Sequence, residues 1–201
     1  MVRFSVLSLS LMALLAAAPA KAEPVKYDFD KSHTQILFFT DHGGFSKQEG
    51  EFREFDGSFT FNKEDPANSA VDVTIKTGSI DMDSDKWDAH MKNEDFFNVE
   101  KFPTMTFKST EVKVTGDNTA DVTGDLTLLG VTKPVVLHVT HNKSGENMRG
   151  TYVSGFSAVA SIDRTQWGMT YGVPMMNPNI DIRIETEGSP AGTASGDAPN
   201  Q

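Results

Sequence analysis

Apolar and polar residues alternate with a period of two along most of the chain after residue 23. This period is typical of strands whose two faces meet different surroundings. It is clearest at residues 71–76 and 180–185. The same pattern predicts further strands at residues 34–40, 52–61, 104–114, 120–129, 134–141 and 150–164. The chain therefore predicts an all-β fold with eight or more short antiparallel strands.

Short polar segments separate these strands. Gly43-Gly44 and residues 65–68, 116–118 and 142–145 are rich in Gly, Pro, Asn and Asp. These residue types supply the backbone angles that tight turns need, so most connections should be hairpins. A sandwich and a closed barrel both fit this pattern, and the barrel also removes exposed strand edges.

One segment lacks the alternation and predicts a short helix. Residues 83–91 carry Ser84 or Asp85 as a cap, with Trp87 and Met91 on one face. Residues 93–102 then resemble an irregular loop that ends at a proline.

Both ends of the chain differ from the body. Residues 1–22 combine Arg3 with an apolar run and small residues before Glu23, as in a cleaved secretory signal. The apolar run is shorter than the roughly 20 residues that span a bilayer, so we expect cleavage and no stable membrane insertion. Residues 189–201 contain no large apolar side chain and predict a disordered tail. We therefore expect one domain, residues 23–188, in a protein that is exported to a bacterial periplasm.

Composition excludes several classes of protein. The 201 residues include no cysteine, which rules out disulfides and thiolate metal sites. The chain has 28 acidic and 18 basic residues and a formal net charge of −10. Nucleic acid is therefore not an expected partner, because its phosphates require a basic surface.

Residues 81–85 begin like a calcium-binding loop. However, Lys86 and Lys92 occupy the positions at which such a loop needs Gly and Glu. The sequence contains neither a glycine-rich phosphate loop nor a nucleophile elbow. We expect an acidic turn before the helix, and no cofactor.

The five histidines do not form an evident metal site. His138 and His141 are three residues apart in a strand and point to opposite faces. His33 and His42 flank one predicted strand and lie at least about 20 Å apart if it is extended. We therefore predict no bound metal.

Phenylalanine is unusually common, with 14 Phe against 3 Tyr and 2 Trp. Twelve of the Phe residues lie between Phe29 and Phe107. A barrel of about eight strands can fill its interior with side chains or hold one small ligand. A long apolar ligand would need many such rings and few polar partners.

Short motifs follow one another in order along the domain. The first is Tyr27-x-x-Asp30-x-Ser32-His33-Thr34, the most specific is residues 124–135, and Ile162-Asp163-Arg164-x-x-Trp167-Gly168 is the last. Between them stand His42-x-Gly44-x-Ser46, Gly50-x-Phe52, Phe55-Asp56-Gly57, Ser79-Ile80, Asp88-Ala89-His90-Met91, Asp95-Phe96-Phe97, Phe102-Pro103-Thr104 and Phe107-Lys108-Ser109. In this order, over about residues 27–187, the chain resembles the YceI-like family.

The resemblance implies an extended, lipocalin-like antiparallel β-barrel of about eight strands with a short helix near one end. It also implies export and, for some members, a polyisoprenoid or similar amphiphile inside the barrel; others are linked to quinones or to stress responses. Trp87 stands where the family often has Arg, and Phe102 where it often has Tyr. The first departure removes a charge from the barrel mouth.

Two predicted strands carry apolar rows that end in a polar residue, His42 in one and Arg164 in the other. We expect these two residues at the head group of an amphiphile. The residues expected along its apolar tail are Ile36, Phe38, Phe52, Phe59, Phe61, Phe107, Leu126, Leu128, Phe156, Ala158, Ala160, Ile162 and Trp167.

The resulting hypothesis is a periplasmic binding or carrier protein, not an enzyme, whose partner is an isoprenoid lipid or a quinone-like amphiphile. The first alternative is a stress-related structural protein with a filled barrel and no specific ligand. The second is an enzyme acting on an isoprenoid, with Asp41, His42 and Arg164 as its acid–base residues. A homodimer is compatible with all three.

Overall fold

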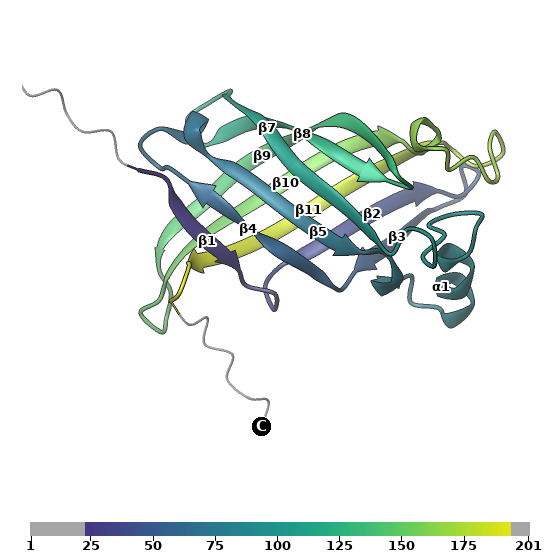
Figure 1. Cartoon of the computed structure of the whole chain (residues 1–201), viewed down its shortest axis with the longest axis horizontal. Coiled ribbons are helices and arrows are strands. Elements are labelled where there is room, and N and C mark those ends of the chain that lie inside the picture. Colours follow the sequence, from purple (N-terminus) through teal and green to yellow (C-terminus); the bar gives the residue numbers. More distant parts are fainter. Residues whose placement is uncertain (1–22, 194–201) are drawn as a thin grey trace, which may run out of the picture.

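The computed structural model describes residues 23–193. They form one antiparallel barrel with a short helix at one end (Figure 1). The expected signal at residues 1–22 lies outside the described residues, as do residues 194–201 of the expected tail. Among the described residues, no helix has the length and apolar character needed to cross a membrane.

Eight strands close into a ring because the last strand pairs with the first, Tyr27 standing opposite Pro190. Closure leaves these strands without a free edge over the length of the ring. In ring order they are β1 (Val25–Phe29), β4 (Phe55–Phe61), β5 (Ala70–Lys76), β7 (Thr104–Val114), β8 (Thr119–Leu128), β9 (Val131–Glu146), β10 (Tyr152–Asp163) and β11 (Asn179–Pro190). The predicted barrel is therefore confirmed.

Three further strands continue the wall toward the helix. They are β2 (Gln35–Asp41), β3 (Lys47–Phe52) and β6 (Ile80–Asp81). β1 and β2 pair with successive parts of β11, and the order continues from β2 to β3 to β6. No pairing of β6 with β7 is recorded among residues 23–193. The ring of backbone hydrogen bonds is therefore interrupted at this end.

Helix α1 (Asp85–Lys92) and the segment 93–103 lie beside this interruption (Figure 1). The backbone N–H of Met82 donates to Asp88 Oδ1 at 2.8 Å, which ties α1 to β6. Thr77 Oγ1 donates to the carbonyl of Phe102 at 2.7 Å. The ring of Phe97 packs against that of Phe52 on β3, with centroids 5.3 Å apart. Side chains, rather than a strand ladder, therefore complete the wall here.

The predicted helix and the irregular loop after it are confirmed. Helix α1 begins two residues later than expected. The predicted strand at 52–61 is confirmed over Phe55–Phe61 as β4, but its start is wrong, because Phe52 ends β3 and the two residues after it belong to neither strand. There the backbone N–H of Arg53 donates to Ser79, and its guanidinium pairs with Asp81 at 2.5 Å. The strands β1, β3 and β6 carried no prediction; β3 exposes most of its polar residues, and β6 has only two residues.

The predicted turn at 142–145 is also wrong, because β9 and β10 remain paired there. The turn lies at residues 147–151, where Asn147 and Thr151 are hydrogen-bonded and Gly150 has a φ of 76°. β11 likewise runs two residues past the expected end of the domain. Ser189 pairs with Asp28 and is buried, so the start of the expected tail belongs to the barrel.

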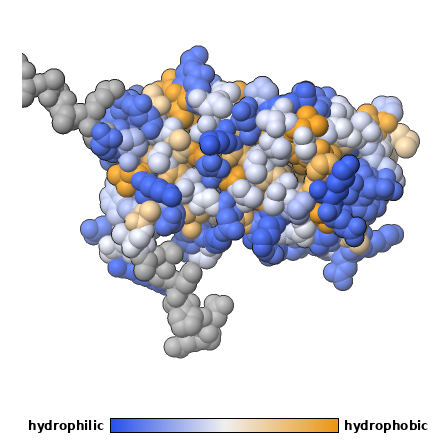
Figure 2. Space-filling model, in the orientation of Figure 1, coloured by the Kyte–Doolittle hydropathy of each residue, from blue (hydrophilic) through white to orange (hydrophobic). Residues whose placement is uncertain are grey.

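Apolar side chains cover the inner side of the barrel wall. On β10, Ala158 and Ala160 are buried whereas Val159 between them is 51% exposed, as the period of two requires. Hydrophilic and intermediate residues cover most of the face seen in Figure 2, with apolar residues scattered between them. Trp167, in the turn η3 (Arg164–Trp167), is only 3% exposed, and its Nε1–H donates to the carbonyl of Leu126 at 3.1 Å.

Candidate ligand cavity

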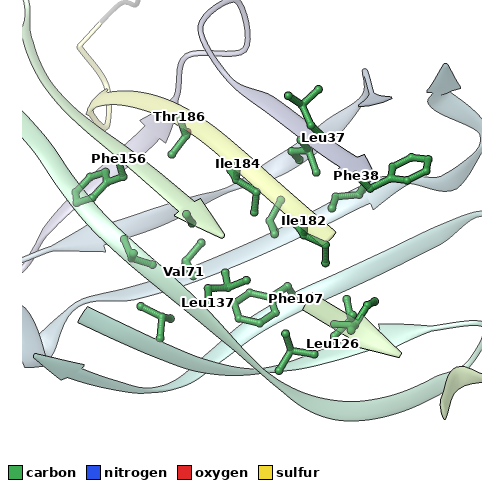
Figure 3. A pocket seen from close by; sticks show the side chains of 18 of the residues that line it. Leu37, Phe38, Val71, Phe107, Leu126, Leu137, Phe156, Ile182, Ile184 and Thr186 are labelled. Carbon is green, nitrogen blue, oxygen red and sulfur yellow. The ribbon is translucent and has the colours of Figure 1, made fainter. Parts of the chain in front are cut away.

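A cavity of about 460 Å³ lies inside the barrel. Its volume falls in the range of sites that hold small organic ligands. Figure 3 shows side chains from strands on all sides pointing into it, among them Phe107 of β7, Leu137 of β9 and Ile184 of β11. The inward positions of the strands are almost all apolar, so the cavity is an apolar space within a hydrogen-bonded wall.

The cavity follows the length of the barrel. Phe156 lines one part of it and Arg164 another, and eight residues separate them along β10 and η3. At about 3.3 Å per residue this corresponds to roughly 26 Å along the strand. Lys63 and His141 line the end near Phe156, and His42 lines the end near Arg164. A linear molecule fits this shape better than a compact one.

The phenylalanines both touch one another and line the cavity. The rings of Phe59 and Phe156 meet edge to face with centroids 5.5 Å apart, and those of Phe38 and Phe52 lie 5.6 Å apart. Ten of the 13 Phe residues within residues 23–193 line the cavity, so most of these rings face it. The lining rings are Phe29, Phe38, Phe52, Phe55, Phe59, Phe61, Phe96, Phe97, Phe107 and Phe156.

The structure brings most of the predicted site residues to this cavity. Thirteen of the fifteen line it, including both predicted head-group residues, His42 and Arg164. Ala160 and Trp167 are not among the lining residues. Both are buried in the core, where Trp167 binds the backbone of β8. The role of the lining residues in binding stays a prediction.

Arg164 differs from the free cation that its position at the end of a strand indicates. It is 3% exposed, and its Nη1 and Nη2 donate to the carbonyls of Met169 and Tyr171 at 3.0 and 2.8 Å. Its guanidinium carbon lies 5.9 Å from the centroid of the Phe96 ring. Burial lowers the pKa of Arg164, against the attraction of Asp163. The side chain thus shapes the loop after η3 while it lines the cavity.

His42 stands exposed in the β2–β3 hairpin. The carboxylate of Asp41 accepts a hydrogen bond from the backbone N–H of Gly44 at 2.7 Å and so forms the turn. Among the described residues, no recorded hydrogen bond joins any two of the side chains of Asp41, His42 and Arg164.

The end of the cavity near β9 carries a polar group that the sequence analysis missed. The ring of His141 packs against Phe61 and Phe156, at centroid distances of 5.0 and 5.1 Å. Its Nε2 lies 2.7 Å from Ser144 Oγ, which lies 2.9 Å from Ser154 Oγ. Burial, with a smaller contribution from a nearby lysine, lowers the pKa of His141, which favours the neutral ring. A register shift beside Phe156 creates this contact, and no sequence pattern shows it.

His138 and His141 do point to opposite faces, as their spacing predicted. His138 Nδ1 lies 2.7 Å from Asp121 on the exposed side. A different group could offer three metal ligands: atoms of Asp30, His33 and Glu187 lie within 4.8 Å of one another. No prediction from the sequence covered this group of Asp30, His33 and Glu187.

Hydrogen bonds within this group account for its geometry. Asp30 Oδ1 accepts from the backbone N–H and the hydroxyl of Ser32, at 2.9 and 2.6 Å. His33 Nδ1 lies 2.8 Å from Asp30 Oδ2. This hydrogen bond raises the pKa of His33. Asp30, Ser32 and His33 therefore belong to the turn that joins β1 to β2, and Glu187 lies beside it on β11.

Known proteins resemble this chain in sequence over most of its length. The family model described as the YceI-like domain matches residues 27–188. A UPF0312 protein of Pseudomonas aeruginosa PAO1 is 40% identical over 176 residues, which cover 88% of this chain and 92% of that protein. The family model thus covers the barrel except for two residues at each end.

Solved structures share the architecture. The crystal structure of Burkholderia cenocepacia BcnA gives a TM-score of 0.70 at 22% identity and covers 80% of this chain and 99% of that one. A polyisoprenoid binding domain from Saccharophagus degradans, implicated in plant cell wall breakdown, gives a TM-score of 0.62 at 12% identity, covering 83% and 99%. At these identities the likeness establishes the fold alone.

Proposed function

This chain belongs to the YceI-like family, and on that premise we propose that it binds or carries a long-chain isoprenoid amphiphile inside its barrel. The observation that carries the proposal is the elongated cavity lined by ten phenylalanine rings. Few of the lining groups are polar, and those few gather toward the two ends. An amphiphile has the same distribution of polarity.

Energetics favour such a ligand. Moving one carbon of an apolar chain out of water stabilises by about 0.8 kcal/mol, so one five-carbon isoprene unit contributes about 3–4 kcal/mol. A tail of several units would exceed the cost of immobilising the ligand. The polyisoprenoid binding domain that shares this fold supports the choice of an isoprenoid tail. His42 and Arg164 would then lie at the head group, or at a quinone-like ring.

The proposed place of action is the periplasm. The support is the pattern of residues 1–22, in which Arg3 precedes an apolar run that ends in small residues before Glu23. In a bacterium that exports the full chain, the periplasmic protein should have the mass of a chain that starts at Glu23. A product that retains residues 1–22 in the cytoplasm would exclude this place of action.

Native mass spectrometry before and after organic extraction is the deciding experiment. The protein purified from its periplasm should carry an extractable lipid of isoprenoid mass, and the extracted protein should take up polyprenyl compounds. The same spectra report whether the protein is a dimer. A protein that carries no lipid and takes up none of these compounds would exclude the carrier function and favour a filled barrel.

A phenylalanine at position 158 should block the cavity. Ala158 faces inward and lines it, so Ala158→Phe should weaken binding of a polyprenyl ligand at least tenfold and change the free energy of unfolding by less than about 1 kcal/mol. Urea unfolding and ligand titration measure the two quantities. Val159→Phe is the matched control, because its side chain points outward from the same strand. A filled barrel would instead lose about 1–3 kcal/mol to overpacking in Ala158→Phe.

A further inference from the structure

We propose that the cavity selects an amphiphile whose head group is an oxyanion, a carboxylate or a phosphate, and that this anion binds at Arg164. The inference rests on the proposed function, because it requires that the cavity hold an amphiphile. It adds the charge of the head group, which decides between anionic isoprenoids and neutral alcohols or quinones.

Arg164 forms no direct ion pair in the described part of the chain, although Asp163 attracts its charge. No carboxylate oxygen of residues 23–193 is recorded within 4.0 Å of its guanidinium, although the residue is 97% buried. The neighbouring carboxylate of Asp163 instead accepts from the N–H and hydroxyl of Thr165, at 2.9 and 2.6 Å. A buried charge without a direct ion pair is costly. An anion delivered from the cavity would remove that cost.

The guanidinium also keeps a free donor. Its two Nη atoms each donate to a carbonyl, of Met169 and of Tyr171, whereas no acceptor is recorded for Nε–H. Every fully buried polar side-chain atom in the described residues has a partner, so Nε must retain accessible surface. Arg164 lines the cavity, and the cavity is therefore the space from which an acceptor can reach it.

The two carbonyls have a second effect, since they fix the direction of the side chain. Arginine is always charged, and its planar donors match the geometry of carboxylate and phosphate oxygens. A guanidinium held in place by the protein loses little entropy when it binds an anion. The arrangement is thus a preorganised cation at the end of an apolar space.

One other Lys or Arg side chain lines the cavity within residues 23–193. Lys63 is exposed and lies at the opposite end, near the ring of His141. Lys63 is the matched comparison for Arg164, because an anionic head group at either end of the cavity would be attracted to the basic residue there. Removing each charge separately tells which end holds the head group.

The experiment uses three C15 probes that share one tail: farnesyl phosphate, farnesoic acid and farnesol. Their dissociation constants are measured by calorimetry on delipidated wild-type protein and on the variants Arg164→Gln and Lys63→Gln. Wild type should bind the two anions about tenfold or more tightly than the alcohol. Arg164→Gln should bring the three constants together, whereas Lys63→Gln should keep the difference. The ratio between the phosphate and the carboxylate identifies which oxyanion is preferred.

Each other outcome has a definite meaning. Equal affinity of wild type for all three probes would overturn the inference and leave the carrier function standing, whereas no binding of any probe would count against the carrier function itself. A uniform loss of all three in Arg164→Gln would show that Arg164 only shapes its loop. Loss of discrimination in Lys63→Gln would assign the anion to the other end. If Arg164→Gln does not fold, the wild-type discrimination and its retention in Lys63→Gln decide the question.

Discussion

Replacing Trp167 by alanine should lower the free energy of unfolding by about 3–5 kcal/mol. The indole is 3% exposed and packs in the main core. Its removal would leave a void beneath the loop that follows η3 and would strip the carbonyl of Leu126 of its donor. Urea unfolding followed by circular dichroism measures the loss. A loss below about 1 kcal/mol would show that Trp167 does not anchor this end of the barrel.

Trp87→Ala is the matched control, because Trp87 is the only other tryptophan of the chain and is 43% exposed on α1. We expect its loss of stability to stay below about 1 kcal/mol. Because each variant keeps one tryptophan, the same samples report the fluorescence of each indole. The Trp87 signal should respond to ligand, since this residue lines the cavity and Trp167 does not.

The second large effect is expected at Gly57 in β4. Its φ is +146°, and a Cβ there would lie 2.2 Å from the carbonyl oxygen of Asp72 on the paired strand β5. Backbone cannot yield as a side chain can, so Gly57→Ala combines strain in φ with a clash between strands. We expect a loss of about 3 kcal/mol or more. Thermal and urea unfolding of the purified variant measure it.

Gly78→Ala provides the control for Gly57→Ala. A Cβ at Gly78 meets no atom within 4 Å, and its φ is not in the positive range. The substitution should be neutral or stabilise by up to about 1 kcal/mol, because it restricts the unfolded chain. Equal stabilities of the two variants would contradict the clash assigned to Gly57.

The barrel could be predicted because its strands obey one rule, alternation with inward apolar residues. Residues 156–162 of β10 and 180–184 of β11 show this rule, and the sequence located both strands. β3 could not be found in the same way. Its polar side chains face outward and its inward side holds Gly50, where a Cβ would collide with the ring of Phe38.

The cavity was predictable in its lining but not in its chemistry. The period of two determines which side chains of a strand face inward, and thirteen of the fifteen predicted residues therefore line the cavity. The state of Arg164 depends instead on the loop that folds back after η3 and supplies two carbonyls. His141 depends on a register shift between β9 and β10. Both are tertiary contacts that no local pattern records.

The interruption between β6 and β7 has a mechanical consequence. Around the ring that β1 and β11 close, dilation of the tube would break backbone hydrogen bonds, each of which contributes about 1 kcal/mol net. Beside α1, dilation requires only that packed side chains such as Phe97 move apart. The barrel is therefore stiff at one end and compliant at the other. A molecule that is bulkier at its head than along its tail suits such a tube when its head lies at the compliant end.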